Sequence, residues 1–427
     1  MSGEQRHRVV IVGGGFGGLQ AAKALRNAPV EVTLIDRRNF HLFQPLLYQV
    51  ATSGLSPGDI AAPLRRILRR QRNTRVIMDE VTGVDVGRRM VILKNREVPY
   101  DTLVVAAGAS HSYFGNQQWE EVAPGLKTLE QATEIRRRVL LAFEAAEIAT
   151  DQAARRALLT FVIVGAGPTG VELAGTLGEV ANDTLRGDFR TIDPAEAQII
   201  VVDRSPRVLP GFPEDLSAAA ERSLIKLGVR ARTGVGVTHI DREGVTLETP
   251  NGSERIAART VIWAAGVEAS PLGRAIAEQT GATADRAGRV SVAPDCSVPG
   301  HPEIFIIGDL ANYTHQNGKS LPGLCPVAMQ QGRYVGHLIR ARLGGSACGP
   351  FHYIDKGNLA TIGRKQAVGI LAGLHFSGVV AWLLWLFVHL MYLIGFQNRL
   401  LVATQWAFHY FTYNRGARLI TGGKKPD

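Results

Sequence analysis

Glycines at a fixed spacing follow an apolar run near the start of the chain. Gly13, Gly15 and Gly18 fit the pattern G-x-G-x-x-G directly after the β-branched run VVIV. In such a loop the first glycine allows the tight turn, the second lets a pyrophosphate approach the backbone, and the third lets the following helix pack on the strand. The helix then points its N-terminal amides at the pyrophosphate. Asp36 ends the next strand, 23 residues after Gly13, where an acid can hold ribose hydroxyls. The pattern predicts a dinucleotide site.

A second copy of the pattern lies about 150 residues further on. Gly165, Gly167 and Gly170 follow the apolar run TFVIV, and Asp203 ends the next apolar run. Asp203 comes 38 residues after Gly165, which is longer than the usual spacing of about twenty, because residues 182–197 read as an inserted loop. Two such patterns in one chain predict that it binds two dinucleotides.

Three later strand-like segments end in glycine and would return the backbone to these sites. They end at Gly108, at Gly266 and, after the buried run Ile304 to Ile307, at Gly308 and Asp309. Asp309 can accept hydrogen bonds from cofactor hydroxyls, or it can cap the helix that follows. The sequence leaves both roles open.

Several other segments are predicted from periodicity and composition. Residues Thr128 to Ala154 have the pattern of one long helix, and Leu321 to Leu343 that of a loop leading into a helix that carries Gln330 and Gln331 near its start. The segment from Phe43 to Tyr48 is apolar and interrupted by Pro45, so it can pack under a loop or line an apolar cleft.

Composition narrows the class of protein. The 427 residues suffice for two or three domains, and the net charge of +10 would suit an anionic partner. No nucleic-acid-binding module is visible, and the basic run Arg65 to Arg72 has the spacing of a helix face, which is either solvated or in contact with membrane phosphates.

The three cysteines, Cys296, Cys325 and Cys348, form no C-x-x-C pair, so we expect neither a metal site nor a redox disulfide. The first ten residues contain no apolar run typical of a signal peptide.

The C-terminal part of the chain has a different character. Phe376 to Phe396 contains 21 residues without Lys, Arg, Asp or Glu, and as one helix it would be about 31 Å long, near the thickness of a bilayer core. It can cross a membrane, lie on it, or pack in a soluble core or dimer interface. The segment that follows mixes aromatic residues with basic ones, which is typical of an amphipathic helix at an anionic surface. These basic residues are Arg399, Arg415, Arg418, Lys424 and Lys425.

Taken together, these segments resemble the type II NADH:quinone oxidoreductases. The matching stretches run along nearly the whole chain, and the more specific ones are FQPLLYQVATSG, PVAMQQG and WLLWLFVHLMYLIGFQNRLL. The resemblance implies an α/β fold with two Rossmann-like dinucleotide-binding domains and a C-terminal helical membrane-associating segment. We expect an FAD domain in residues 1–125 and 289–372, an NADH domain in residues 126–288, and membrane-associating helices in residues 373–427.

The resemblance also implies roles for individual residues. FAD would be held by Gly13, Gly15, Gly18, Asp36, Gly108 and Asp309, and NADH by Gly165, Gly167, Gly170, Asp203 and Gly266. Glu172 matches an acid that in the family lies near the nicotinamide and the flavin, and we expect it to position the substrate or conduct protons. A quinone would bind near Tyr48, Gln330 and Gln331. Pro326 stands where many relatives have Gln, so the polar side of that cleft can differ here.

By this resemblance, hydride passes from the nicotinamide C4 to the flavin N5, and two electrons then reduce a membrane quinone of a respiratory chain. The negative charge of Asp203 predicts a preference for NADH over NADPH, with Arg204 and Arg207 nearby as an opposing influence. We expect no bound metal, no binding of nucleic acid and no proton pumping. The expected location is the cytoplasmic side of the cell membrane, where the protein would be peripheral or monotopic. A single transmembrane helix and a homodimer are both open possibilities. Two alternatives remain. One is a sulfide:quinone oxidoreductase, which would need a pair of reactive cysteines beside the flavin, where Cys325 is the only thiol expected. The other is a membrane-bound redox-signalling flavoprotein.

Overall fold

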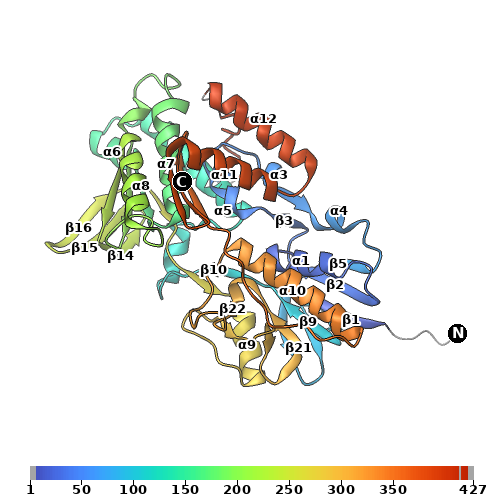
Figure 1. Ribbon diagram of the computed structural model, residues 1–427. Coiled ribbons are helices and arrows are strands. Elements are labelled where there is room, and N and C mark those ends of the chain that lie inside the picture. Colours follow the sequence, from blue (N-terminus) through green and yellow to red (C-terminus); the bar gives the residue numbers. More distant parts are fainter. Residues whose placement is uncertain (1–5, 413–414, 422–427) are drawn as a thin grey trace. The chain divides into compact units, whose positions relative to one another are not determined.

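The computed structural model describes residues 6–412 and 415–421, with only the backbone of Phe396 (Figure 1). By its contacts the chain forms two units. Unit 1 comprises Met1–Leu42, Ala61–Ser110 and Val267–Asp355, and unit 2 comprises Phe43–Ile60, His111–Gly266 and Lys356–Asp427. The four domain ranges expected from the sequence stay predictions.

Unit 1 is built on a six-stranded sheet with the strand order β20-β21-β9-β1-β2-β5. Its strands are parallel except for the β20–β21 pair. Val9, Val10, Ile11 and Val12 of β1 are buried, as their β-branched run predicted. The strands are β1 (His7–Val12), β2 (Val30–Asp36), β5 (Thr74–Met78), β9 (Thr102–Val105), β20 (Ser297–Val298) and β21 (His301–Ile306).

Two helices of unit 1 pack closely because their contact residues are small. A Cβ on Gly332 of α10 would lie 2.1 Å from the carbonyl oxygen of Gly17 in α1, and one on Gly336 would lie 2.5 Å from the Cβ of Ala24. Figure 1 shows α10 in orange against α1 in blue. The helices of unit 1 are α1 (Phe16–Ala24), α4 (Leu64–Leu68), α9 (Pro271–Thr280), α10 (Cys325–Leu343) and the 3₁₀ turn η5 (Gly308–Leu310).

Short strands complete unit 1, and one helix is shorter than the sequence suggested. The helix expected over Arg65 to Arg72 ends at Leu68, so the second half of this basic run is not helical. The short strands are β3 (Phe40–Leu42), β4 (Ala61–Pro63), β6 (Val81–Asp85), β7 (Met90–Leu93), β8 (Glu97–Pro99), β10 (Ala109–His111, whose last residue belongs to unit 2), β18 (Val267–Ala269), β19 (Val290–Ser291) and β22 (Ala311–Asn312).

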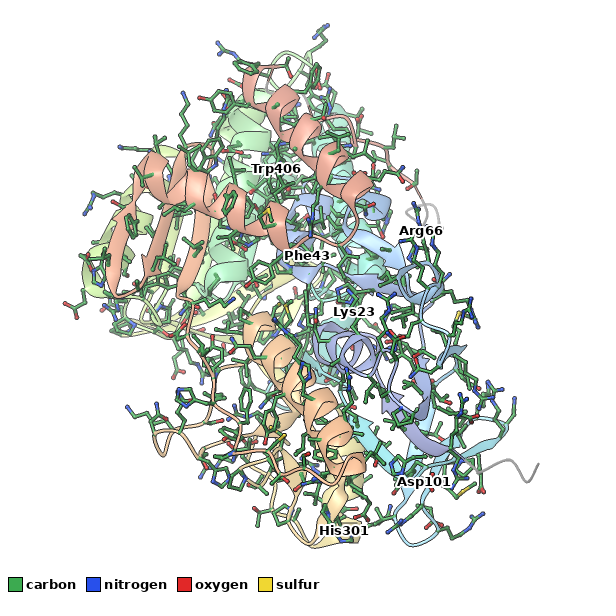
Figure 2. All side chains as sticks on the ribbon, turned by 45° about the vertical axis from the view of Figure 1, so that its right-hand side comes forward. Lys23, Phe43, Arg66, Asp101, His301 and Trp406 are labelled. Atoms are coloured by element: carbon green, nitrogen blue, oxygen red, sulfur yellow. The ribbon has the colours of Figure 1, made fainter. Side chains whose placement is uncertain are left out.

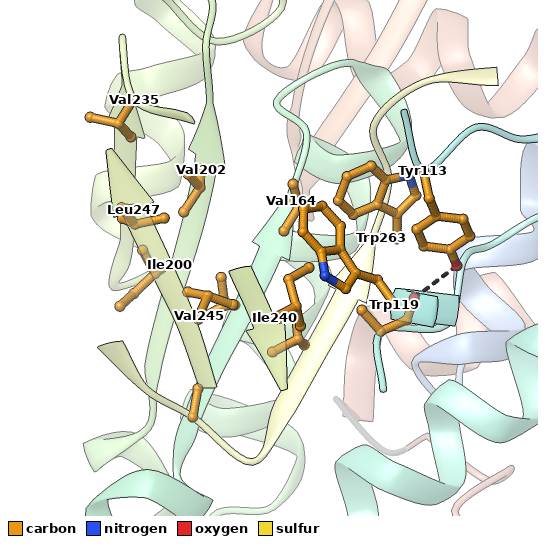
Figure 3. Close-up of a cluster of buried hydrophobic side chains, with 14 residues drawn as sticks. Tyr113, Trp119, Val164, Ile200, Val202, Val235, Ile240, Val245, Leu247 and Trp263 are labelled. Carbon is orange, nitrogen blue, oxygen red and sulfur yellow. Dashed lines mark hydrogen bonds between the residues drawn. The ribbon is translucent and has the colours of Figure 1, made fainter. Parts of the chain in front are cut away.

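Unit 2 contains a parallel four-stranded sheet, order β13-β12-β11-β17, and an antiparallel three-stranded sheet, order β14-β15-β16. Buried side chains of both sheets meet an aromatic group formed by Tyr113, Trp119 and Trp263 (Figure 3). The Tyr113 hydroxyl donates to the Ala123 carbonyl at 2.9 Å. The strands are β11 (Thr160–Val164), β12 (Gln198–Asp203), β13 (Val229–Thr233), β14 (Gly236–Asp241), β15 (Gly244–Thr249), β16 (Gly252–Ala257) and β17 (Thr260–Trp263).

The long helix expected from Thr128 to Ala154 is two helices in the structure. Helix α5 begins after a capping box formed by Thr128 and Gln131, and Asp151 caps a new helix by accepting from the Ala154 amide at 2.7 Å. The helices in this part of unit 2 are η1 (Gln44–Leu46), α2 (Leu47–Ala51), α3 (Pro57–Ile60), η2 (Gln117–Glu121), α5 (Leu129–Ile148), α6 (Gln152–Leu158), α7 (Pro168–Glu179), η3 (Val180–Thr184), η4 (Pro194–Glu196) and α8 (Glu214–Lys226).

The C-terminal segment does not form the single helix that the run from Phe376 to Phe396 suggested. Its first residues belong to a strand, α11 is 15 residues long, and the chain turns at Leu393 to Gly395 before α12 begins. Among the residues described, no helix combines the length and the hydropathy that a membrane crossing requires. The elements are β23 (Asn358–Gly363), β24 (Gln366–Leu371), β25 (Leu374–Ser377), α11 (Gly378–Tyr392) and α12 (Phe396–Thr412).

Both C-terminal helices bury one face and expose large apolar side chains on the other. On α11, Ala381 and Trp385 are buried, whereas the residues spaced by four on another face are exposed. The exposed apolar residues of the two helices, named here the apolar face, are Val379, Val380, Leu383, Phe387, Met391, Leu400, Leu401, Phe408 and Phe411. Lys424 and Lys425 lie outside the described residues.

Candidate functional sites in the two units

The first glycine loop joins β1 to α1 in unit 1. Gly13 has φ +100°, and a Cβ there would lie 2.3 Å from the Ala106 carbonyl oxygen; a Cβ on Gly18 would lie 1.9 Å from the carbonyl oxygen of Gly13. Both positions therefore require glycine because of the protein's own backbone. A Cβ on Gly15 would meet no atom within 4 Å. The space beside the middle glycine is where a pyrophosphate approaches the backbone in this loop type, so the residues present fit a bound dinucleotide.

Asp36 ties the end of β2 to this loop. Its Oδ2 accepts from the Gly14 amide at 2.6 Å, and its Oδ1 accepts from the Arg38 amide at 2.7 Å. A carboxylate can accept about four hydrogen bonds, so it can hold the loop and still bind ribose hydroxyls.

His41, which the sequence analysis did not single out, also holds the loop. Its side chain is 2% exposed, its Nδ1 lies 2.9 Å from the Gly14 carbonyl oxygen, and its ring meets Phe16 edge-on at 5.0 Å. Burial lowers the pKa of His41 to about 4, so the ring is neutral at pH 7 and Nδ1 carries the proton that it donates to Gly14. Nε2 has no hydrogen-bond partner among the residues described. A single His after the second strand was the only sequence signal.

Gly108 and Asp309 follow β9 and β21, which are neighbours in the same sheet. Gly108 has φ +71° and open space beside it. Asp309 lies inside η5 rather than at its N-cap, which is Ile307, so the helix-capping alternative is not what the structure has.

The two glutamines of α10 have structural partners. Gln331 is 1% exposed, and its Oε1 accepts from the Gly308 amide at 2.7 Å, which fastens the turn before Asp309 to the helix. The side-chain amide of Gln330 pairs with the Ile354 backbone, donating at 2.9 Å and accepting at 3.0 Å. Both side chains thus have a structural role, and their contact with a quinone stays a prediction.

The second glycine loop repeats the geometry of the first. Gly165 has φ +112° and a Cβ there would lie 2.7 Å from the Ala264 carbonyl carbon, while a Cβ on Gly170 would lie 1.8 Å from the Gly165 carbonyl oxygen. A Cβ on Gly167 would meet no atom within 4 Å. Unit 2 thus has the same open space beside its middle glycine, at the start of α7.

Asp203 repeats the contacts of Asp36. Its Oδ2 accepts from the Ala166 amide at 2.6 Å, and its Oδ1 accepts from the Ser205 amide at 2.7 Å. Of the two nearby arginines, Arg207 is directed to Glu214, at 3.6 Å, and to the Pro210 carbonyl. The negative charge of Asp203 at the end of β12 is therefore not cancelled by Arg207.

Glu172 lies in the first half of α7 and is buried. Burial raises its pKa to about 8, and the Thr361 amide and the Trp385 indole N–H oppose this rise. The carboxyl group is therefore mostly protonated at pH 7, and it can donate a hydrogen bond as well as accept one.

A pocket of about 110 Å³, named here the aromatic pocket, lies next to these groups within unit 2. It is lined by residues of α2, α7, the β23–β24 turn, α11 and α12. Thr361 and Trp385 belong both to its wall and to the surroundings of Glu172. Figure 2 labels Trp406 of this wall. The aromatic and histidine residues that line it are Tyr48, Trp382, Trp385, Trp406, His409 and Tyr410.

Tyr48 is held in this wall by its neighbours. Its hydroxyl accepts from Gln49 at 2.9 Å, its ring lies 6.4 Å from that of Trp385, and Trp406 donates to Gln49 at 2.8 Å. Burial raises the pKa of Tyr48 well above its usual value, so the hydroxyl remains protonated.

Charged residues also belong to the wall of the pocket, among them Glu179, Arg364 and Arg415. Arg415 forms an ion pair with Glu179 of α7 at 2.6 Å, and Glu179 also accepts from the Arg364 amide. Arg418 pairs with Asp188. The expected basic residues of this tail, as far as they are described, therefore include two that bind the protein's own carboxylates.

The three cysteines lie in different surroundings: Cys296 is buried, Cys325 is partly buried and Cys348 is exposed. All three are free, and burial raises the pKa of Cys296. Within residues 6–412 and 415–421, no group of His, Cys, Asp and Glu is arranged to hold a metal ion.

Comparisons with known proteins define the class and then the family. A family model described as pyridine nucleotide-disulphide oxidoreductase matches residues 7–332, so the chain belongs to this class of α/β enzymes. A second, described as the NDH2 C-terminal domain, matches residues 356–413.

Two proteins of Mycobacterium tuberculosis, both named type II NADH:quinone oxidoreductase, are 47% and 48% identical to the chain. The first similarity covers 98% of this chain and 91% of the relative, and the second covers 97% and 90%. The structure of NDH2 from Plasmodium falciparum in complex with NADH shares the fold, with a TM-score of 0.88 at 19% identity, covering 98% of this chain and all of that one. The chain belongs to the type II NADH:quinone oxidoreductases.

Proposed function

We propose that the chain oxidises NADH by means of a bound FAD and reduces a membrane quinone by two electrons, as an NADH dehydrogenase of a respiratory chain that does not pump protons. The observation that carries this proposal is the repeated loop: each unit has one glycine loop whose first and third glycines are required by the backbone and whose middle glycine borders open space. Two such loops suit one resident dinucleotide and one that is exchanged. FAD supplies the chemistry of accepting a hydride and passing on two electrons.

Unit 1 holds the FAD in this proposal. Gly13, Gly15 and Gly18 accommodate its pyrophosphate, Asp36 binds the adenosine ribose, and Gly108 and Asp309 lie against it from the neighbouring strands. The short contacts from Asp36 and His41 to Gly14 support this, because they fix the loop before the cofactor arrives.

Unit 2 binds NADH through Gly165, Gly167, Gly170, Asp203 and Gly266. The carboxylate of Asp203 favours a ribose hydroxyl and repels the 2′-phosphate of NADPH. Glu172, protonated at pH 7, positions the nicotinamide by a hydrogen bond or conducts a proton.

The quinone site of this proposal is the aromatic pocket of unit 2, with Tyr48 in its wall. The quinone contacts of Gln330 and Gln331 stay predictions from the sequence. Aromatic walls suit a planar apolar ring, and the protonated Tyr48 hydroxyl can donate a hydrogen bond to a quinone oxygen. The apolar face of α11 and α12 supports contact with lipid, on the cytoplasmic side of the membrane. A homodimer stays a prediction.

One assay with purified enzyme tests the proposal. NADH should be oxidised in the presence of a soluble quinone analogue, with kcat/KM at least tenfold higher than for NADPH. Turnover with sulfide in place of NADH would favour the sulfide:quinone alternative, and equal kcat/KM for the two nucleotides would refute the role of Asp203. A redox-signalling flavoprotein would reduce the quinone with neither NADH nor sulfide.

A further inference from the structure

Phe114 is an aromatic residue that the dinucleotide and quinone sites above do not use. It lies in the loop after β10, its side chain is 68% exposed, and its φ is +52°, in the left-handed region that non-glycine residues rarely occupy. Asn116 donates to the Tyr113 and Phe114 carbonyl oxygens at 3.3 and 3.4 Å, and these contacts hold the loop. An exposed ring kept in a strained backbone conformation is a pointer to a functional role.

The ring of Phe114 is placed by the end of β17. A Cβ on Gly266 would lie 2.5 Å from its Cζ, so the ring covers this glycine. The ring centroid lies 6.1 Å from that of Trp263, which in turn stacks on Tyr113 at 4.9 Å (Figure 3 shows Trp263 and Tyr113). The Ser112 amide donates to the Gly266 carbonyl oxygen at 3.3 Å. Phe114 thus extends an aromatic group of the core to the surface.

This surface lies at the carboxyl edge of the parallel sheet, where α/β folds bind ligands. Strand β17 pairs with β11, Val164 opposite Trp263, and the turn after β17 is so close to the glycine loop that a Cβ on Gly165 would meet Ala265 at 2.8 Å. On the other side of β11 lies β12, which ends at Asp203.

The sheet order therefore gives the bound dinucleotide a direction. Its adenosine ribose belongs with the acid that ends β12, and its pyrophosphate with the glycine loop after β11. The other half of the dinucleotide then extends over the end of β17, toward Gly266 and Phe114.

We propose that Phe114 is a binding residue for the nicotinamide half of the dinucleotide in unit 2, whose planar ring packs against the exposed ring. This inference rests on the proposed function, since it takes NADH as the ligand of unit 2. Contacts between aromatic rings contribute to binding beyond the area they bury, so losing the ring should raise the dissociation constant by about three- to tenfold.

The test uses the purified holoenzyme in its oxidised state, titrated calorimetrically with NAD⁺ and with ADP-ribose, which lacks the nicotinamide. Phe114→Ala should raise the Kd of NAD⁺ by about three- to tenfold and leave that of ADP-ribose unchanged, and Phe114→Tyr should restore the affinity for NAD⁺. Ile225→Ala, which removes another exposed apolar side chain of unit 2, is the matched control and should change neither value.

A further variant separates binding from folding. Phe114→Gly removes the ring and the backbone strain together, so its melting temperature should not fall while NAD⁺ binds as weakly as in Phe114→Ala. Equal weakening of both ligands, or unchanged affinity for NAD⁺, would overturn the inference. A wild-type enzyme that binds neither ligand and does not oxidise NADH would instead contradict the proposed function.

Discussion

His41 and Glu172 are both ionisable and both nearly without solvent contact, and burial makes each of them neutral at pH 7 by opposite pKa shifts. It lowers the pKa of the histidine to about 4 and raises that of the carboxylic acid to about 8, because in each case it disfavours the charged form. Sequence reasoning found Glu172 only through the family resemblance, and it missed His41. The reason is physical: their protonation depends on burial by segments distant in the chain.

Replacing Glu172 by Gln should lower turnover. Gln keeps the size of the protonated acid but cannot exchange a proton and has different hydrogen-bond geometry, so we expect kcat with a soluble quinone to fall about tenfold or more. Any change of the wild-type rate near pH 8 that belongs to Glu172 should also vanish in the variant. A steady-state rate equal to that of the wild type between pH 6 and 9 would rule out both a positioning and a proton-conducting role.

His41 should make the protein less stable in mild acid. In the unfolded chain its pKa is near 6.5, whereas in the folded chain it is about 4, so between these values only the unfolded chain takes up the proton. The stability contributed by the neutral His41 is present above pH 6.5 and is lost as the pH falls toward 4, by about 3 kcal/mol in total. The decrease in unfolding free energy between pH 7 and pH 5, measured by urea titration, should be smaller in His41→Gln. An unchanged decrease would show that His41 takes no part.

At the scale of elements, sequence patterns predicted the two strand–loop–helix modules and the presence of C-terminal helices, but the bounds of the first C-terminal helix were wrong. The two strand–loop–helix modules can be predicted because their glycines and β-branched runs determine the conformation of the backbone next to them in the chain. The run from Phe376 to Phe396 instead contains a strand end, a helix and a turn, with positive φ at Gly378 and Gly395. A count of apolar residues does not detect such turns, and it does not show that Trp385 of α11 is buried in the wall of a pocket.

Charge on the apolar face should release the protein from membranes. Phe387 of α11 is 64% exposed, and burying a large apolar side chain contributes about 1.5–3 kcal/mol, so Phe387→Glu should weaken binding to vesicles containing anionic lipid by tenfold or more. Sedimentation with the vesicles measures this binding. The control is Ile148→Glu, which adds the same charge at an exposed position of α5. If both variants bind as the wild type does, another surface must contact the lipid.

In the whole molecule, the two units share one arrangement: a carboxylate at the end of a strand accepts a hydrogen bond from a backbone amide of the glycine loop. In unit 1 Asp36 accepts from the Gly14 amide, and in unit 2 Asp203 accepts from the Ala166 amide. The sequence predicted both acids and their loops. It did not predict that Gln331 would fasten a turn in unit 1 or that Arg415 would pair with Glu179 in unit 2, because these contacts join residues far apart in the chain.

NADH oxidation by the reconstituted enzyme should not acidify the lumen of sealed vesicles. Proton pumping needs a path with several ionisable residues across the membrane, and the apolar run from Phe376 to Phe396 contains no Lys, Arg, Asp or Glu. A pH-sensitive dye trapped inside proteoliposomes, with a soluble quinone as acceptor, gives the measurement. Acidification that is abolished by a protonophore would contradict the prediction.

The core of unit 2 is built from segments that are far apart in the chain. Its core combines Tyr48, from near the start of the chain, with α7 from the middle and Trp385 and Val402 from near its end. The apolar side chains of the segment around Tyr48 therefore stay exposed to solvent until the ribosome has synthesised α11 and α12. Unit 2 therefore cannot complete its core before α11 and α12 have been made, and its exposed apolar segments favour aggregation during that interval.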